Sequence, residues 1–456
     1  MNVYDVMAEA CMKVRSLPKS EQNSLFCEYW ANPLRVNIVE EYLPYLSKEN
    51  SGVIYSEFEI DQINEMWQYV KDREPKCSFY LLVYLDNYID FNKSFIRYCK
   101  FSPKLVQDTC HFSALGQNQA GFLLPKFKPC WEKANQHTNE ELNSDPLSIV
   151  QNYLWVEKRQ GWTVVNLYND KWNNDHERPF VIACSPLTDK WTFNPQFVES
   201  TDGNIFYISE YYEVEQEKIL KRTEKILEYS NAKGASVVLL PELLASHETQ
   251  KHIGRYLKRH WDYNYPRVVC TPSSGITEAG AKSNRTIVMN SRGETIFQYN
   301  KQMAYQHEKD HIKYFESITP DKQLYVLHIK GIGRVAILIC ADIFSDEIQD
   351  ILFRGYQVNL LLIMSLTKGT DQFFRAISQS QQVSCDVVWC NSCAAYSQKS
   401  KKNKVVAYFA NGHENCKMYV KKKCKNKSCV GCVMLITLSQ EYNGEGKIEQ
   451  QYLNIE

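Results

Sequence analysis

The sequence predicts an α/β protein whose carboxyl-terminal part is built on sheets and whose amino-terminal part is mostly α-helical. Residues 335–339 are five consecutive apolar residues, which is typical of a strand buried on both faces. Residues 180–184 and 237–240 are two further short apolar strands, and a strongly periodic helix over 214–235 lies between them. Strand, helix and strand in this order form a βα unit, and sites in such sheets gather at the carboxyl ends of the strands.

Bulk composition is that of an ordinary globular protein. The chain has 456 residues, 44% of them hydrophobic and 23% charged, which leaves room for two or three domains. Lys plus Arg and Asp plus Glu both total 53, so no overall charge favours nucleic acid or an anionic membrane. We expect neither a secretory signal nor a spanning helix. The 16 cysteines are scattered, so we expect mostly reduced thiols and a cytoplasmic location.

The first 175 residues carry a helical pattern. Within the first predicted helix, apolar side chains recur at the spacing of one helix face. These are Val6, Met7, Ala10, Cys11 and Val14. Further helices are predicted over 21–30, 33–43, 58–72, 76–98 and 145–159. We find no metal spacing, phosphate loop or nucleophile motif here, so residues 1–175 are predicted to be a helical accessory or partner-binding domain, with an unrecognised enzymatic domain as the alternative.

A polar stretch over 172–179 predicts the boundary, so the second domain would span 176–456. Three of its residues are candidates for chemistry. Glu242 follows a buried strand and Pro241, Lys301 follows a predicted hairpin, and Cys340 ends the apolar run at 335–339. Taken alone, each has an ordinary explanation: Glu242 is a surface glutamate, Lys301 a solvated lysine at a sheet edge, and Cys340 a core cysteine.

Together these residues form an ordered Glu, Lys, Cys series with intervals of 59 and 39 residues. The segments GASVVLLPE, GETIFQYNK and ILICAD that carry them resemble motifs of the nitrilase superfamily, the carbon–nitrogen hydrolases. The resemblance covers about residues 178–440. It implies a nitrilase-like four-layer αββα sandwich, often paired across a dimer interface, so we expect a homo-oligomer.

The resemblance also implies roles for the three side chains. Cys340 would attack the substrate as a thiolate, its pKa lowered by its neighbours. Glu242 would act as the general base, and Lys301 would stabilise the oxyanion with the backbone N–H of Ala341. This chemistry predicts hydrolysis of a non-peptide carbon–nitrogen bond, in an amide rather than a nitrile, without a cofactor.

One departure from the family pattern concerns a second glutamate, which many members place shortly before an aromatic-Phe pair. Tyr314 and Phe315 fit that pair, but the aligned acidic position is His311. Assuming helical spacing, we assign the second carboxylate to Glu308 in preference to Glu316.

The segment 399–427 holds ten lysines with interleaved aromatic residues. A solvated surface is the favoured interpretation, and a patch for nucleic acid or an acidic partner is the alternative. Four cysteines nearby form a weak zinc candidate, although ordinary thiols are favoured and no metal is expected. These are Cys416, Cys424, Cys429 and Cys432.

Three functions therefore stay open. The first is a cysteine amidohydrolase acting on a small amide. The second is an effector or interaction protein, of the kind found in bacterial defence, whose amino-terminal domain binds a protein partner. The third is an acyltransferase or amidotransferase subunit, which would need a synthetase partner because the chain has no ATP loop.

Overall fold

The computed structural model describes the residues 3–31, 60–88, 101–106, 109–112, 116–127, 145–169, 179–201, 203–260, 267–278, 281–329, 331–380, 384–396, 404–412, 417–421, 431–439 and 447–453. The chain forms two compact units. The first comprises 1–105, 110–127 and 135–160, and the second comprises 106–109, 128–134 and 161–456. The long continuous segment of the second unit begins at Gly161, whereas the predicted boundary lies after residue 175. Strands β1 (Phe101–Val106) and β2 (Thr109–Phe112) lie where the chain passes between the units.

The first unit is mostly helical, as predicted. Its helices are α1 (Val3–Arg15), α2 (Lys19–Ala31), α4 (Ile60–Val70) and α5 (Pro75–Tyr88). All five apolar residues predicted to share one face of the first helix are buried. The helix predicted over 33–43 lies outside the described residues.

The helix predicted over 145–159 is wrong. Residues Pro146–Ile149 form a short 3-10 helix, and Tyr153–Glu157 form strand β5. This strand pairs with β4 (Gly121–Pro125), which in turn pairs with β3 (Gly116–Gln117). Aromatic and β-branched residues favour a strand when a pairing partner is present, and sequence periodicity cannot show that partner.

The larger sheet of the second unit contains the predicted strand before Cys340. Its strand order in this unit is β6-β17-β18-β19-β20-β21-β22. These strands are Thr163–Asn169, Gln323–Ile329, Gly333–Ile339, Leu360–Ser365, Asp386–Asn391, Val405–Ala410 and Lys417–Lys421. Strands β18, β19 and β20 are parallel neighbours and every residue in them is buried, so their carboxyl ends meet at one edge of the sheet.

The second sheet has the order β12-β13-β11-β10-β7-β23-β24, with β14 paired to β13. Its strands are β7 (Phe180–Cys184), β10 (Val237–Leu239), β11 (Val268–Cys270), β12 (Ser274–Glu278), β13 (Ala281–Met289), β14 (Thr295–Asn300), β23 (Cys432–Leu438) and β24 (Lys447–Tyr452). The predicted βα unit is confirmed, because β10 runs parallel to β7 and the helix α7 (Glu213–Ala232) connects them. The predicted hairpin is confirmed as β13 and β14.

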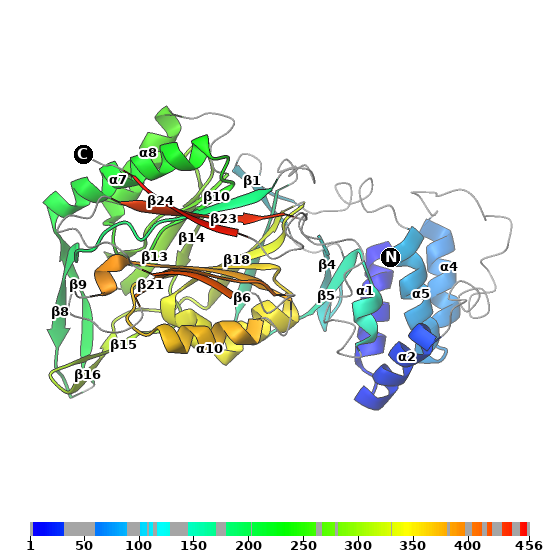
Figure 1. Cartoon of the computed structure of the whole chain (residues 1–456). Helices are drawn as coiled ribbons and strands as arrows, with labels where there is room; N and C mark the ends of the chain where they lie inside the picture. Colours follow the sequence, from blue (N-terminus) through cyan, green and yellow to red (C-terminus); the bar gives the residue numbers. More distant parts are fainter. Residues whose placement is uncertain are drawn as a thin grey trace. The chain divides into compact units, whose positions relative to one another are not determined.

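The two sheets pack face to face between helices. Figure 1 shows α7 and α8 (His247–Arg259) over the sheet that holds β10 and β23, and α10 (Thr370–Ser380) under the sheet that holds β6, β18 and β21. The second unit is therefore an αββα sandwich. The predicted fold class, a four-layer sandwich preceded by a mostly helical region, is confirmed.

A third, small sheet has the order β15-β16-β9-β8. Strands β8 (Phe193–Val198) and β9 (Ile205–Tyr211) form one hairpin, and β15 (Gln306–Lys309) and β16 (Ile312–Glu316) form another. The first hairpin lies in the chain between β7 and α7, where the sequence predicted only a polar loop. The parallel pairing of β16 with β9 joins the two hairpins.

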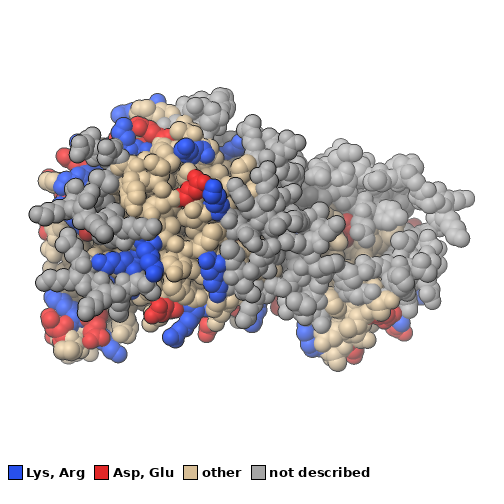
Figure 2. All heavy atoms as spheres, viewed as in Figure 1, with Lys and Arg blue, Asp and Glu red and all other residues tan. Residues whose placement is uncertain are grey.

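Acidic and basic side chains are intermixed over the described surface of the second unit on the face shown in Figure 2. Most of the lysines in the segment 399–427 lie outside the described residues, so the nucleic-acid hypothesis stays a prediction. Within the described ranges, no helix has the length and apolar character needed to cross a membrane.

The β13–β14 turn offers a test of the fold. Gly293 has a φ of +72°, and a Cβ built on it would lie 2.0 Å from the carbonyl oxygen of Gly254. We expect Gly293→Ala to lower the free energy of unfolding by about 1–3 kcal/mol, because alanine disfavours this φ and the backbone of α8 must move. Gly355→Ala is the control, since its nearest contact would be 3.7 Å away. Equal thermal stability of the two variants would contradict this account of the turn.

Candidate active site

The structure brings Glu242, Lys301 and Cys340 together at the carboxyl ends of strands from both sheets. Glu242 follows β10, Lys301 follows β14, and Cys340 follows β18. The Lys301 Nζ donates a hydrogen bond of 2.7 Å to Glu242 Oε1, and the Cys340 thiol lies close enough to the same carboxylate for its charge to act on the thiol. All three side chains are buried, yet all three line one pocket. The sulfur is therefore not enclosed in packed hydrocarbon.

The Lys301 ammonium group lies between two carboxylates. Besides Glu242, it donates to Glu316 Oε2 over 2.5 Å. The Lys301 side chain is 1% exposed, so this is a buried cluster of charges rather than a surface ion pair. Burial acts to lower the pKa of Lys301, but the charges of Glu242 and Glu316 raise it well above its usual value. The ammonium group is therefore charged at neutral pH.

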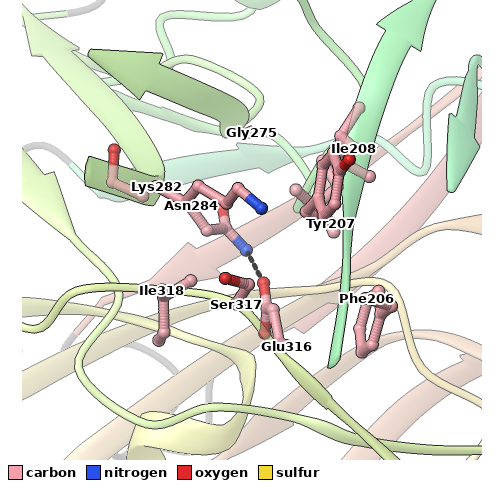
Figure 3. A pocket seen from close by; sticks show the side chains of 11 residues that line it. Phe206, Tyr207, Ile208, Gly275, Lys282, Asn284, Glu316, Ser317 and Ile318 are labelled. Carbon is pink, nitrogen blue, oxygen red and sulfur yellow. Dashed lines mark hydrogen bonds between the residues drawn. The ribbon is translucent and has the colours of Figure 1, made fainter. Parts of the chain in front are cut away.

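Asn284 of β13 connects the two carboxylates. Its Nδ2 donates to Glu242 Oε1 and to Glu316 Oε1, each over 2.9 Å. Figure 3 shows the bond to Glu316. The side-chain oxygen of Asn284 accepts a hydrogen bond of 2.6 Å from Ser273 Oγ, which fixes the orientation of the amide. The second oxygen of Glu242 accepts from the backbone N–H of Leu366 over 3.0 Å. Both glutamates are thereby held in one geometry before any substrate arrives.

Cys340 begins a 3-10 helix, Cys340–Phe344, and has a φ of +50°. A non-glycine residue in this left-handed region carries strain of about 1–3 kcal/mol. The sharp turn ends the strand at Ile339, and Cys340 lines the pocket. This is the turn that the sequence predicted after the apolar run, and it places the backbone of Ala341 next to the sulfur-bearing residue.

Asp342 connects this turn to the segment that carries Lys301. Its Oδ1 accepts hydrogen bonds from the backbone N–H groups of Gln302 and Met303, over 2.9 and 2.8 Å. Its Oδ2 accepts from the Tyr299 hydroxyl over 2.7 Å and from the backbone of Ile339 over 3.1 Å. Burial raises the pKa of Asp342 to about 6, so at neutral pH it is an anion held by four donors. The aspartate of the ILICAD segment thus has a structural role.

The expectation that neighbouring groups lower the pKa of Cys340 is wrong. Burial and the charge of Glu242 raise the pKa of this thiol well above its usual value, and the opposing effect of Lys301 is smaller. Burial also raises the pKa of Glu242, and the charge of Glu316 adds to this, whereas Lys301 opposes it. The resting site therefore contains a neutral thiol beside a carboxylate that is more basic than an exposed glutamate.

The assignment of the second carboxylate to Glu308 is also wrong, because Glu316 is the residue that lies beside Lys301. Residues 306–316 form the β15–β16 hairpin instead of a helix, with Asp310 and His311 at the turn, both at positive φ. The Glu308 side chain is 61% exposed, and Glu308 lies opposite Lys313 in the strand pair. Side chains alternate between the two faces of a strand, so Glu316 shares the inward face of β16 with Tyr314.

The pocket above Cys340 has a volume of about 510 Å³, its open mouth included. It is lined by Trp191, Phe193, Pro195, Phe197, Phe206, Glu242, Leu243, Lys301, Tyr305, His307, Glu316, Cys340 and Leu366. A second cavity of about 320 Å³, drawn in Figure 3, lies on the other side of Glu316 and Asn284. Phe206, Leu243 and Glu316 line both cavities and separate them.

The zinc candidate stays untested. Cys416, Cys424 and Cys429 lie outside the described residues, while Cys432 is a buried residue of β23. In the ranges that the structure describes, no group of three or more His, Cys, Asp or Glu side chains is arranged to hold a metal ion.

Sequence reasoning missed Asn284, Ser273 and the aromatic residues of β8 and β9. Asn284 does have a signal, since it shares a strand face with Thr286 and Val288 and all three are buried. A polar residue on the inward face of a predicted strand is a candidate for a buried hydrogen-bond network.

Searches of family models and of curated proteins found no match. Among solved structures, Nit3 of Saccharomyces cerevisiae, described as a member of branch 10 of the nitrilase superfamily, is 11% identical. The match covers 58% of this chain and 91% of that chain, with a TM-score of 0.41. The NitFhit protein of C. elegans is 15% identical over 58% of this chain and 61% of that chain, with a TM-score of 0.38.

An amidase of Nesterenkonia sp. AN1, with the acetamide moiety of fluoroacetamide added covalently at the active site cysteine, is 13% identical. The match covers 57% of this chain and 91% of that chain, with a TM-score of 0.39. The chain is thus similar to several nitrilase-superfamily structures. With identities of 11–15% and TM-scores below 0.5, these similarities carry no argument about activity, and the chemistry of the site rests on its own geometry.

The raised pKa of Cys340 gives a test of the resting site. We expect alkylation of Cys340 by iodoacetamide to accelerate continuously from pH 6 to pH 9, because the thiol is protonated throughout that range. The rate is measured by mass spectrometry of the Cys340 peptide, with Cys340→Ala as the control for other thiols. A rate that is already maximal near pH 6 would show a resting thiolate and contradict the assignment.

Proposed function

We propose that this protein hydrolyses a non-peptide carbon–nitrogen bond, that of a small amide, through a thioester on Cys340. The observation that carries the proposal is the position of Glu242, which accepts a hydrogen bond from the Lys301 ammonium group and lies beside the Cys340 thiol in one accessible pocket. A nucleophile, a base and a fixed positive charge within one another's reach are the parts that acyl transfer requires.

In the first half of the reaction, Cys340 Sγ attacks the carbonyl carbon and its proton passes to Glu242. The resulting oxyanion is stabilised by the Lys301 ammonium group and the Ala341 backbone N–H. When the carbon–nitrogen bond breaks, Glu242 returns the proton to the nitrogen and ammonia leaves. Loss of one oxyanion donor typically costs about 2.7–4 kcal/mol of barrier, which sets the scale of the contribution of Lys301.

In the second half, Glu242 takes a proton from a water molecule that attacks the thioester carbon. The carbon–sulfur bond then breaks, and the sulfur recovers its proton from Glu242. The sum is one amide and one water converted to one carboxylic acid and one ammonia. The raised pKa of Glu242 suits both halves, because a stronger base accepts the thiol or water proton more readily.

Glu316 supports an amide over a nitrile. It lines the pocket, and its carboxylate lies within the cluster that binds Lys301 and Asn284. An amide –NH₂ group donates two hydrogen bonds, which carboxylate oxygens accept, whereas a nitrile nitrogen donates none. The homo-oligomer, the cytoplasmic location and a protein partner for residues 1–175 stay predictions.

The proposal is tested by ammonia release from a panel of aliphatic and aromatic amides. We expect Cys340→Ala, Glu242→Gln and Lys301→Met each to lower kcat/KM by roughly 10³-fold or more, because each removes a part that acts only in the transition state. Glu316→Gln should lower kcat/KM by roughly 10- to 100-fold, because Lys301 loses one of its two negatively charged partners.

Glu308→Gln is the matched control. It changes a carboxylate on the same hairpin that is exposed and outside the pocket, so its kcat/KM should stay within about twofold of the wild type. If the folded wild-type protein released no ammonia from any amide, or if Cys340→Ala kept full activity, the proposal would fail.

A further inference from the structure

The inserted β8–β9 hairpin supplies one wall of the pocket. Trp191, Phe193, Pro195 and Phe197 are spaced two residues apart, and all four line the pocket that holds Cys340. Alternate residues of a strand share one face, so this spacing gives β8 and Trp191 just before it one continuous apolar surface. Phe206 of β9 pairs with Phe197 in the strand register, and their ring centroids lie 5.9 Å apart.

The pocket lining next to this hairpin is also uncharged. The His307 ring lies 5.6 Å from Phe197 and 5.8 Å from Phe206, between centroids, and Tyr305 and Leu366 complete the lining on this side. Burial lowers the pKa of His307, and the charges of Lys368 and Lys309 lower it further. The imidazole is therefore neutral at neutral pH, and the wall is largely aromatic.

The lining has charged side chains only at the floor. They are Glu242, Lys301 and Glu316, which are bonded to one another. Lys309 and Lys368 are exposed, and the Lys309 Nζ lies 4.4 Å from the centroid of the Phe197 ring, at the outer part of the wall. A carboxylate on the substrate would enter an apolar pocket with two glutamates at its floor, and its desolvation would be poorly compensated.

We propose that the β8–β9 hairpin is the acyl-binding wall of the site, and that the substrate is an amide whose carbonyl carbon carries an uncharged apolar group, aliphatic or aromatic. This inference rests on the proposed function and adds the class of substrate to it. An apolar group of several carbons would lie against Phe197, Phe206 and His307 while its carbonyl carbon faces the Cys340 sulfur. Each buried methylene contributes about 0.8 kcal/mol, or about fourfold in kcat/KM.

The first test uses 5-methylhexanamide and glutaramate, which have the same shape and differ in one charge. We expect kcat/KM for 5-methylhexanamide to exceed that for glutaramate by at least roughly 100-fold and that for acetamide by at least roughly 10-fold. A preference for glutaramate, or equal values for all three amides, would overturn the inference.

Variants then assign the selectivity to the hairpin. Phe197→Ala and Phe206→Ala should each lower the ratio of kcat/KM for 5-methylhexanamide to kcat/KM for acetamide by roughly 10-fold. Gln196→Ala is the matched control, because Gln196 is an exposed residue of β8 that does not line the pocket. Equal losses on both amides would indicate a general structural effect and overturn the role of the wall.

A charge introduced in the wall gives a result that damage to the fold cannot imitate. Phe197→Lys should shift the preference toward glutaramate by at least roughly 10-fold, since the substrate carboxylate gains a counter-charge. An unchanged ratio, with acetamide still hydrolysed, would place Phe197 outside the acyl-binding wall.

Binding to the Cys340→Ala variant separates this inference from the proposed function. Calorimetric titration should show 5-methylhexanamide binding at least roughly 10-fold more tightly than glutaramate, whether or not the wild-type protein turns over either amide. Selective binding without turnover would contradict the proposed hydrolase activity but support the proposed acyl-binding wall. Turnover of acetamide without selective binding would support the proposed hydrolase activity but contradict the proposed acyl-binding wall.

Discussion

The buried Lys301 ammonium group between two carboxylates is the interaction on which the rest of the site depends. A buried charge costs several kcal/mol unless it is paired and fully hydrogen-bonded. Here the pairing comes from different elements, since Glu242 follows β10, Glu316 ends β16 and Asn284 belongs to β13. A shift of any of these elements by one residue would leave a buried charge unpaired, so the cluster requires the register of these strands. Burial is the main cause that keeps Glu242 basic; the charge of Glu316 adds to it, and the larger effect of Lys301 opposes it.

The nucleophile turn depends on the same region through a second set of bonds. The positive φ of Cys340 is a strained conformation that persists only where its surroundings fix it. Asp342 fixes it from both sides, because it accepts from Ile339 before the turn and from the two residues that follow Lys301. The sulfur-bearing turn and the ammonium-bearing segment are therefore held by one carboxylate. Asp342 thus positions both groups of the proposed reaction without taking a direct part in it.

Sequence reasoning reached the fold and the three principal side chains because each signal is local. Apolar runs mark the buried strands, and Glu242, Lys301 and Cys340 stand directly after predicted strands. The second glutamate was missed because its assignment to Glu308 assumed helical spacing, whereas a tight turn at Asp310 and His311 makes a hairpin. The aromatic wall was missed for a related reason. Trp191, Phe193, Pro195 and Phe197 alternate as a strand face should, but nothing in the sequence places that face opposite a cysteine about 150 residues later. Long-range placement of this kind depends on the pairing of β9 with β16, which local patterns do not encode.

The raised pKa values of Cys340 and Glu242 look unfavourable for catalysis until the proton transfer between them is considered. Burial is the largest cause of both shifts, because it penalises the anionic form of each group. When the thiol gives its proton to the carboxylate, one anion is replaced by another and the net charge of the cluster does not change. The two desolvation penalties therefore largely cancel in this step, and Lys301 remains beside the negative charge throughout. If the thiol instead gave its proton to solvent, the desolvation penalty of the buried thiolate would not be offset. Burial thus suppresses reaction of the free thiol with passing electrophiles, while it leaves transfer to Glu242 available for the proposed reaction with an amide.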